Sequence, residues 1–228
     1  MQSIAVLRCA LLGAGGWQLT TALLLYYITD RAQFPGDEAG RTKQLLDKIT
    51  EAARSGVDYI QLREKDLSSR ELEQLARAAI ERVRASGSMS RLLINSRTDI
   101  ALAVGADGVH LQSRDILGAD LRKIWREANS DTQPIVAVSC HTEAEVAGAK
   151  ASGADFVVFG PVFEKLEASP TGLATLRAAC QHEIPVLALG GITLENARSC
   201  IRTGVAGVAA IRLFQQAEIQ KIVAKLRA

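Results

Sequence analysis

Short apolar runs alternate with longer amphipathic segments along most of the chain. Eight of these runs are rich in aliphatic and aromatic residues, as buried strands are, and the segments between them carry apolar residues at helical spacing. Such alternation predicts a parallel sheet covered by helices, because parallel strands need long crossover connections. The expected strands are residues 23–29, 59–62, 91–95, 108–111, 134–139, 156–159, 185–189 and 207–211, and the expected helices include residues 41–54, 69–85, 142–151 and 194–203.

A four-residue turn recurs ahead of every second expected strand. It reads S-G-V-D at 55–58, V-G-A-D at 104–107, S-G-A-D at 152–155 and T-G-V-A at 203–206. The glycine stands each time where a helix is expected to end. The repeat recurs at a spacing of about 50 residues, which is enough for two βα units. Four such quarters predict an α/β fold, a single closed (β/α)8 TIM barrel over residues 23–228, rather than an open sheet.

The first 22 residues belong to no unit of this repeat. Residues 4–12 are apolar apart from Arg8, and residues 13–16 are rich in glycine. A secretory signal has an apolar region of about 7–15 residues, but the basic flank that should precede it is weak here. We therefore expect residues 1–22 to form an N-terminal extension of unknown role.

Charge and cysteine content exclude several classes of function. The net charge of +2 is too small to favour nucleic acid or a membrane surface as a partner. No apolar run reaches the roughly 18–20 residues that would span a bilayer. The four cysteines show no C-x-x-C spacing, which is typical of reduced thiols in a cytoplasmic protein. They are Cys9, Cys140, Cys180 and Cys200.

The second expected strand and the residues after it read Y-I-Q-L-R-E-K. Side chains alternate along a strand, so Gln61, Arg63 and Lys65 share one face at its C-terminal end. Two cations and an amide donor suit a phosphate or diphosphate, because arginine offers a planar fork and lysine a mobile charge. The alternative is a solvated strand end whose cations form salt bridges with Glu64 and Asp66.

Polar residues also follow other strands, at the rim where barrels of this kind carry their chemistry. A second anion site is expected at Gly190 and Gly191, whose backbone amides, with those at Ala210 and Ile211, would form a phosphate cup. The alternative is a glycine turn that packing requires. The other polar strand ends are Thr29-Asp30-Arg31, Asn95-Ser96-Arg97, His110 with Gln112 and Asp115, and Ser139-Cys140-His141.

Six segments together resemble the superfamily of thiamine phosphate synthase and TenI-like thiazole tautomerase. They are Y-I-Q-L-R-E-K, L-I-N-S-R-T-D-I-A-L, G-A-D-G-V-H-L-Q-S-R-D, V-S-C-H-T-E-A-E, G-A-D-F-V-V-F-G-P-V-F and P-V-L-A-L-G-G-I-T. The resemblance runs in order from about residue 25 to residue 214. These motifs are highly specific for the superfamily and less decisive between its two activities.

The resemblance implies a synthase that joins hydroxymethylpyrimidine diphosphate to thiazole phosphate, with Mg²⁺ assisting the release of diphosphate. It assigns diphosphate binding to Gln61, Arg63, Lys65 and Asn95, and thiazole phosphate binding to Gly190, Gly191, Ala210 and Ile211. Asp115 matches one of the two magnesium aspartates of the family. The expected catalytic residues are Arg63, Lys65, Ser139 and His141.

Two departures from the family pattern affect this assignment. The family has Asn-Asp after strand three, but Asn95 is followed here by Ser96, and a hydroxyl binds Mg²⁺ more weakly than a carboxylate. The family also has a Thr-x-Thr/Ser-Lys run after strand six, where this chain has Lys165, Glu167 and Ala168. Among the neighbouring residues, Ser169 and Thr171 are candidates to compensate, together with Lys165.

These departures keep two alternatives open. The first is a thiazole tautomerase, in which His141 would transfer a proton without metal or diphosphate. The second is a catalytically silent protein that binds a phosphorylated ligand for regulation. His141 is alternatively a loop residue ahead of a helix capped by Thr142 and Glu145, and His110 is expected to be structural. Under every reading the partners are small phosphorylated molecules, and barrels of this size often form homodimers.

Overall fold

The computed structural model describes residues 8–12, 16–20, 22–128, 132–163 and 169–228. Eight parallel strands close into a barrel in the order β10-β3-β4-β5-β6-β7-β8-β9. The predicted fold class is therefore confirmed. The barrel strands are β3 (Leu24–Ile28), β4 (Tyr59–Leu62), β5 (Arg91–Asn95), β6 (Gly108–Leu111), β7 (Ile135–Cys140), β8 (Phe156–Phe159), β9 (Val186–Leu189) and β10 (Gly207–Ala210).

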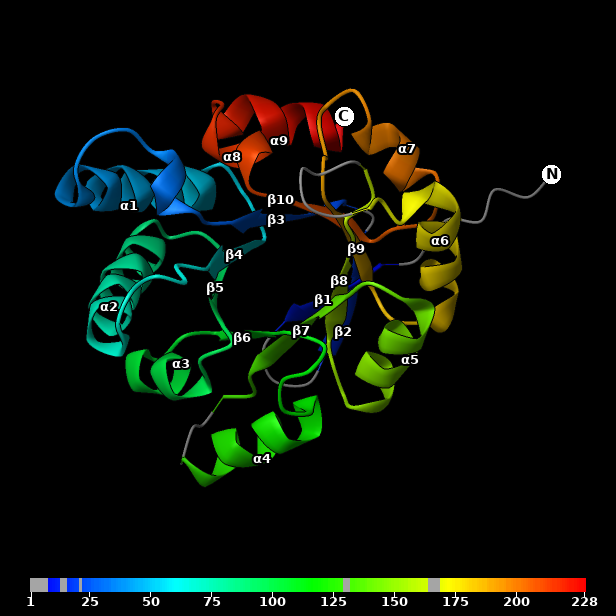
Figure 1. The fold of residues 1–228 in the computed structure, drawn as a ribbon, viewed down its shortest axis with the longest axis horizontal. Coiled ribbons are helices and arrows are strands. Elements are labelled where there is room, and N and C mark those ends of the chain that lie inside the picture. Colours follow the sequence, from blue (N-terminus) through cyan, green and yellow to red (C-terminus); the bar gives the residue numbers. More distant parts are fainter. Residues whose placement is uncertain (1–7, 13–15, 21, 129–131, 164–168) are drawn as a thin grey trace.

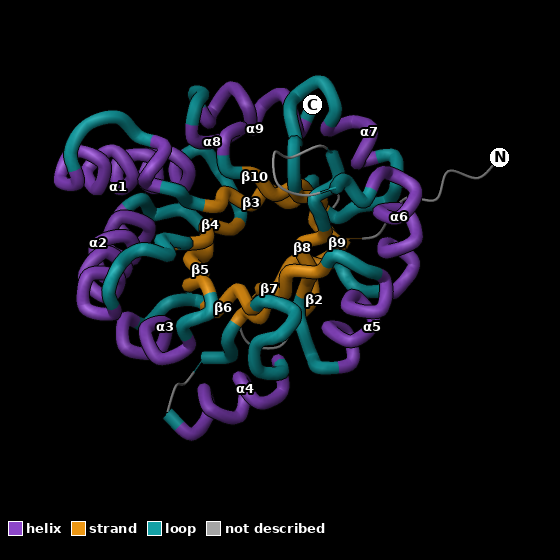
Figure 2. Tube along the Cα trace, in the orientation of Figure 1, coloured by secondary structure: helices purple, strands orange, loops and turns teal. Residues whose placement is uncertain are grey.

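Helices surround the barrel on its outer side, and the strands form the central ring (Figures 1 and 2). The α-helices are α1 (Glu38–Arg54), α2 (Ser69–Ala85), α3 (Thr98–Val104), α4 (Gly118–Glu127), α5 (Glu143–Ala151), α6 (Gly172–Ala179), α7 (Ala197–Ile201), α8 (Arg212–Gln215) and α9 (Ile219–Arg227). Two short 3₁₀ helices are η1 (Arg31–Gln33) and η2 (Cys180–His182). No helix among the described residues is both long and apolar enough to cross a membrane.

The first part of the chain contains an element that the sequence did not predict. Strands β1 (Arg8–Leu12) and β2 (Gly16–Thr20) pair in antiparallel fashion as a two-stranded sheet of their own. They precede the first barrel strand and belong to the predicted extension 1–22, whose role stays open.

Helix bounds differ from expectation where side chains near the helix start decide them. Helix α1 begins three residues earlier than expected, because the Asp37 carboxylate accepts a hydrogen bond from the Gly40 amide and caps the helix. Helix α7 is shorter than the expected 194–203. Ahead of it the Thr193 amide donates to Asn196 Oδ1, so these residues form a turn instead of helix.

The barrel strands are buried on both faces, and each face belongs to a different core. One core fills the barrel interior with residues such as Tyr26, Tyr59 and Phe156, whose rings meet edge to face or tilted. The other core lies between the barrel and its helices and includes Ile60 and Leu62. Residues 59 to 62 therefore alternate between inside and outside, as the sequence predicted for this strand.

The repeated turn holds neighbouring strands together at the N-terminal rim. Asp58, Asp107 and Asp155 each accept a hydrogen bond from a backbone amide of the preceding strand, at 2.7 to 2.8 Å. Each also pairs with arginine, as in the contact of Asp155 with Arg122 at 2.8 Å. The fourth repeat has Ala206 at this place and bonds through its backbone alone. The repeat thus links neighbouring strands at the N-terminal rim, opposite the C-terminal strand ends where the site is expected.

Candidate active site

Four polar side chains line one wall of the barrel interior near its C-terminal mouth. They come from the consecutive strands β4 to β7, at positions where the alternation turns the side chain inward. Gln61 Nε2 donates to Asn95 Oδ1 at 3.0 Å, so the two amides predicted to meet one ligand lie side by side. The wall consists of Gln61, Asn95, His110 and Ser139.

Gln61 differs from Asn95 in how far a ligand can reach it. Gln61 is 1% exposed and donates to its neighbour, which makes it a support for Asn95 as much as an open ligand-binding group. Asn95 is half-buried, and since its oxygen accepts from Gln61, its amide nitrogen is the atom left for a ligand in the described part of the chain.

Arg63 and Lys65 follow this wall where β4 runs out into the mouth. The Arg63 amide donates to Thr29 Oγ1 at 3.0 Å, and its guanidinium forms no ion pair with a carboxylate of the described residues. The predicted alternative was a solvated strand end whose cations pair with Glu64 and Asp66. Its pairing is wrong for Arg63, because both carboxylates bind Arg31 instead. Lys65 is exposed.

A chain of hydrogen bonds connects Ser139 to the barrel interior. Tyr26 Oη lies 2.9 Å from His110 Nδ1, and His110 Nε2 lies 2.7 Å from Ser139 Oγ. Burial, with a smaller effect from the charge of Arg63, lowers the pKa of His110 to about 3, so the ring is neutral.

The buried end of this chain decides the direction of the protons. Tyr26 is fully buried, and among the described residues its hydroxyl meets only Nδ1 of His110, to which it must donate. The proton of the neutral ring is then on Nε2 and is donated to Ser139 Oγ. This arrangement leaves the Ser139 O–H to donate into the mouth. His110 thus contacts Ser139 from the barrel interior, and its structural role stays a prediction.

His141 lies just beyond β7 and is exposed. Its Nδ1 bonds the Gly160 carbonyl, which can only accept, so Nδ1 carries a proton and Nε2 is the nitrogen left to exchange one. Its backbone amide donates to Glu145, which also completes the predicted capping box with Thr142. Both predicted roles, loop residue and proton acceptor, are compatible with this geometry. Its neighbour Cys140 is buried, which raises the pKa of the thiol to about 12 and excludes it as a nucleophile at neutral pH.

Asp115 is the candidate metal ligand, and Ser96 occupies the place of the second aspartate of the family. Asp115 Oδ2 accepts from Ser96 Oγ and from the Gln112 amide, each at 2.8 Å, and so Oδ1 is the oxygen left for a cation. Within the described residues no group of three or more His, Cys, Asp or Glu could hold a metal. Asp115 would hold a Mg²⁺ ion through this one oxygen, and the ion would need its other ligands from outside the described residues.

A glycine turn after β9 lies on the other side of the barrel from β4 and β5. Gly190 has φ +98°, and a Cβ there would lie 2.5 Å from Pro161 Cα, so packing alone requires this glycine. In the described part of the chain, the amides of Gly191 and Ile211 donate to no turn or loop carbonyl, which leaves them available to an anion. Ala210 is buried beside them at the end of β10. Both expectations for the turn therefore stay in place, and the phosphate cup stays a prediction.

The loop after β8, where the second departure from the family pattern lies, is described only at its ends. Lys165, Glu167 and Ala168 lie outside the described residues. Ser169 is exposed, and the Thr171 hydroxyl donates to the Pro161 carbonyl at 3.0 Å, which turns it toward its own loop.

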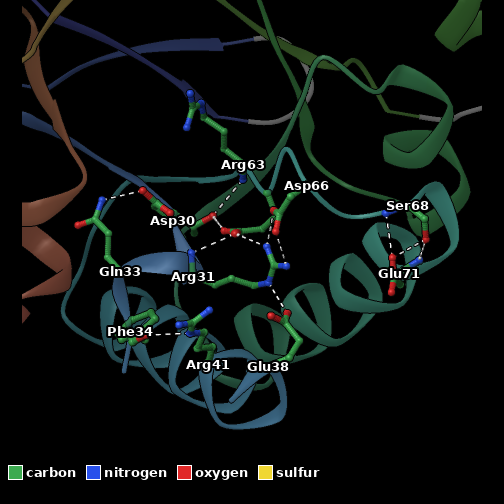
Figure 3. A network of polar contacts seen from close by, with 12 residues as sticks. Asp30, Arg31, Gln33, Phe34, Glu38, Arg41, Arg63, Asp66, Ser68 and Glu71 are labelled. Atoms are coloured by element: carbon green, nitrogen blue, oxygen red, sulfur yellow. Dashed lines mark hydrogen bonds and ion pairs between the residues drawn. The ribbon is translucent and has the colours of Figure 1, made fainter. Parts of the chain in front are cut away.

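Sequence reasoning missed the hydrogen-bonded cluster of Thr29, Arg31, Glu64 and Asp66 at the ends of β3 and β4. Figure 3 shows Arg31 and Asp66 of this cluster. A signal was available in the sequence. The first expected strand ends in T-D-R, and the strand expected beside it is followed by two acids, Glu64 and Asp66. Because these contacts join residues more than 30 positions apart, local sequence reasoning paired the acids with the wrong cations.

Comparisons with known proteins place this geometry in context. The family described as "Thiamine monophosphate synthase" matches residues 25–214. A protein of Geobacter sulfurreducens is 42% identical over 192 residues, which cover 82% of this chain and 84% of that protein. The thiamine-phosphate synthase of Syntrophomonas wolfei is 36% identical over 209 residues, which cover 89% of this chain and 94% of that protein.

A solved structure shares both the fold and recognisable sequence. Thiamine phosphate pyrophosphorylase from Pyrococcus furiosus superposes with a TM-score of 0.73 and 31% identity, and the match covers 90% of this chain and 98% of that one. A 3-hexulose-6-phosphate synthase structure, with a TM-score of 0.63 at 18% identity, is similar in fold alone.

Proposed function

The chain belongs to the thiamine monophosphate synthase family, and we propose that it is a thiamine-phosphate synthase that joins hydroxymethylpyrimidine diphosphate to thiazole phosphate with release of diphosphate. The observation that carries the proposal is the mouth itself. An arginine without a carboxylate partner among the described residues lies on one side, and a glycine turn with unused amides lies on the other. Two facing anion sites suit two phosphorylated substrates that react between them.

Arg63 and Lys65 are proposed to bind the diphosphate and to stabilise the charge that develops as it leaves. Asn95, oriented by Gln61, would donate to the same group. Asp115 would hold Mg²⁺ together with diphosphate oxygens, and the ion would supply further neutralisation of the leaving group. The Ser139 hydroxyl would donate a hydrogen bond to the reacting groups at the centre of the mouth, because its contact with His110 orients it.

The thiazole phosphate is proposed to bind at Gly190, Gly191, Ala210 and Ile211. Backbone amides would hold its phosphate, and the ring nitrogen would then face the pyrimidine carbon from which diphosphate departs. This reaction would require that water be kept from the gap, because water would otherwise capture that carbon.

A second candidate is the tautomerase, and two observations favour it. Ser96 replaces one metal carboxylate, and His141 presents Nε2 for proton exchange from an exposed ring. Relatives such as that of Syntrophomonas wolfei are named as synthases and support the first proposal.

One experiment separates the candidates. The purified protein is mixed with both synthase substrates, with Mg²⁺ and then with EDTA, and thiamine phosphate is measured by mass spectrometry. Metal-dependent product is the expected result. A folded protein that binds thiazole phosphate and forms no product would refute the synthase, and the unaromatised thiazole carboxylate phosphate would be the next substrate, tested with His141→Ala.

The cellular setting is also part of the proposal. Cys140, Cys180 and Cys200 are free thiols in the described residues, which supports a reducing compartment, the cytoplasm. We expect a homodimer, which sedimentation would test.

A further inference from the structure

An ion cluster built around two buried side chains, those of Arg31 and Glu64, lies next to the loop that carries Arg63. The side chain of Arg31 is 5% exposed, and its guanidinium contacts three carboxylates (Figure 3). It binds Asp66 through both terminal nitrogens at 2.7 and 2.8 Å, Glu64 at 3.2 Å, and Glu38 through Nε. Such a forked contact fixes the direction of a side chain as well as its position.

Glu64 transmits this arrangement to Arg63 through one hydroxyl group. Its carboxylate is 2% exposed and accepts from the Arg31 amide and guanidinium on one oxygen and from Thr29 Oγ1, at 2.6 Å, on the other. Because the Thr29 hydroxyl donates its hydrogen to Glu64, its oxygen is free to accept a hydrogen bond from the Arg63 amide, at 3.0 Å. The backbone of Arg63 is thereby tied to Arg31 through two buried hydrogen-bonded groups.

The cluster has a second consequence for the charge at the mouth. Glu64 and Asp66 are close in sequence to Arg63, and their carboxylates could compete with an anionic ligand for its guanidinium. Arg31 binds both of them, and the Arg63 side chain points away from Arg31 (Figure 3). The charge of Arg63 is therefore kept for a ligand.

We propose that Arg31 is a positioning residue of the diphosphate site, which acts through Glu64 and Thr29 to fix Arg63 and binds the two carboxylates that would otherwise neutralise it. This inference rests on the proposed function, because it assumes that Arg63 binds diphosphate. If the cluster were purely structural, substitutions in it would instead lower the stability of the fold and weaken ligand binding at both substrate sites equally.

The test measures binding of inorganic pyrophosphate and of thiazole phosphate by calorimetry, with Mg²⁺ present. Thr29→Val removes the hydroxyl and keeps the shape, and Thr29→Ser restores the hydroxyl. We expect Thr29→Val to weaken pyrophosphate binding about tenfold, which corresponds to about 1.4 kcal/mol, with unchanged binding of thiazole phosphate and recovery in Thr29→Ser. Arg31→Lys keeps the charge, loses the fork to Asp66, and is expected to have the same selective effect.

A matched control breaks an ion pair at the opposite rim. Arg122 binds Asp155 at 2.8 Å and is 25% exposed, and Arg122→Gln is expected to lower the Tm without changing pyrophosphate affinity. Equal weakening of both ligands, or wild-type pyrophosphate binding in folded Thr29→Val and Arg31→Lys, would overturn the positioning role. A wild-type protein that does not bind pyrophosphate would also overturn it. Binding without any synthase turnover would refute the proposed reaction alone, since this test reads affinity.

Discussion

His110 should make the stability of the barrel fall between pH 7 and pH 5. Its ring lies in the barrel interior with a pKa of about 3, mainly because burial disfavours the charged form, whereas an exposed histidine has a pKa of 6.5. Below pH 6.5 the unfolded chain therefore binds a proton that the folded chain does not bind. The stabilising effect of this difference is complete above pH 6.5 and is lost progressively as the pH falls toward 3.

The magnitude follows from the two pKa values. With 6.5 in the unfolded chain and about 3 in the folded chain, the free energy of unfolding should fall by about 2 kcal/mol between pH 7 and pH 5. For a protein of this size that loss corresponds to a decrease in Tm of roughly 4–8 °C.

The assay compares urea unfolding of the wild type and of His110→Gln at pH 7, 6 and 5. The variant should be less stable at pH 7, because it loses part of the hydrogen bonding to Tyr26 and Ser139, and the gap should close by about 2 kcal/mol at pH 5. Burial raises the pKa of Asp58 and Asp155, which stabilises the fold as the pH falls, but both proteins share these groups and the effect cancels in the difference. Parallel pH profiles for the two proteins would refute the reasoning.

Three further predictions concern the mouth. Arg63→Ala should lower kcat/KM for the diphosphate substrate by about a hundredfold, as loss of a charge-stabilising donor does, in steady-state assays. Ser96→Asp should create a Mn²⁺ site that electron paramagnetic resonance detects without substrate, and Ser96→Asn should not. The backbone φ of 55° at Ser96 suits either residue. An unchanged spectrum in Ser96→Asp would contradict the assignment of Asp115 as a metal ligand. Gly190→Ala should destabilise the fold by about 1–3 kcal/mol in urea unfolding, because φ is +98° and its Cβ would clash with Pro161.

The barrel was predictable because its signals are local. Apolar runs mark the strands, glycines end the helices, and the recurrence of one turn reveals four similar quarters. The placement of Gln61 on the opposite face of its strand from Ile60 and Leu62 also followed from alternation, and the structure agrees with it. Each of these inferences needed only residues within a few positions of one another.

The contacts between strand ends were not predictable in the same way. Glu64 stands next to Arg63 in sequence, yet it binds Arg31, because the closed barrel brings the ends of β3 and β4 together. The link from Tyr26 through His110 to Ser139 joins three strands that are separated by whole helices in the sequence. The pairing of β1 with β2 had no clear sequence signal at all.

The two rims of the barrel differ in whether their charged side chains have partners of opposite charge, and this difference supports the proposed location of the site. At the N-terminal rim, acids such as Asp155 bond a backbone amide and an arginine, so each charge has a partner within the protein. At the C-terminal rim, Arg31 binds the nearby acids, and the described residues offer Arg63 no carboxylate. An arginine held in a half-buried position without a counter-charge is unfavourable for the folded protein alone. A diphosphate that binds there would supply that counter-charge, so the arrangement is best explained by ligand binding at this rim.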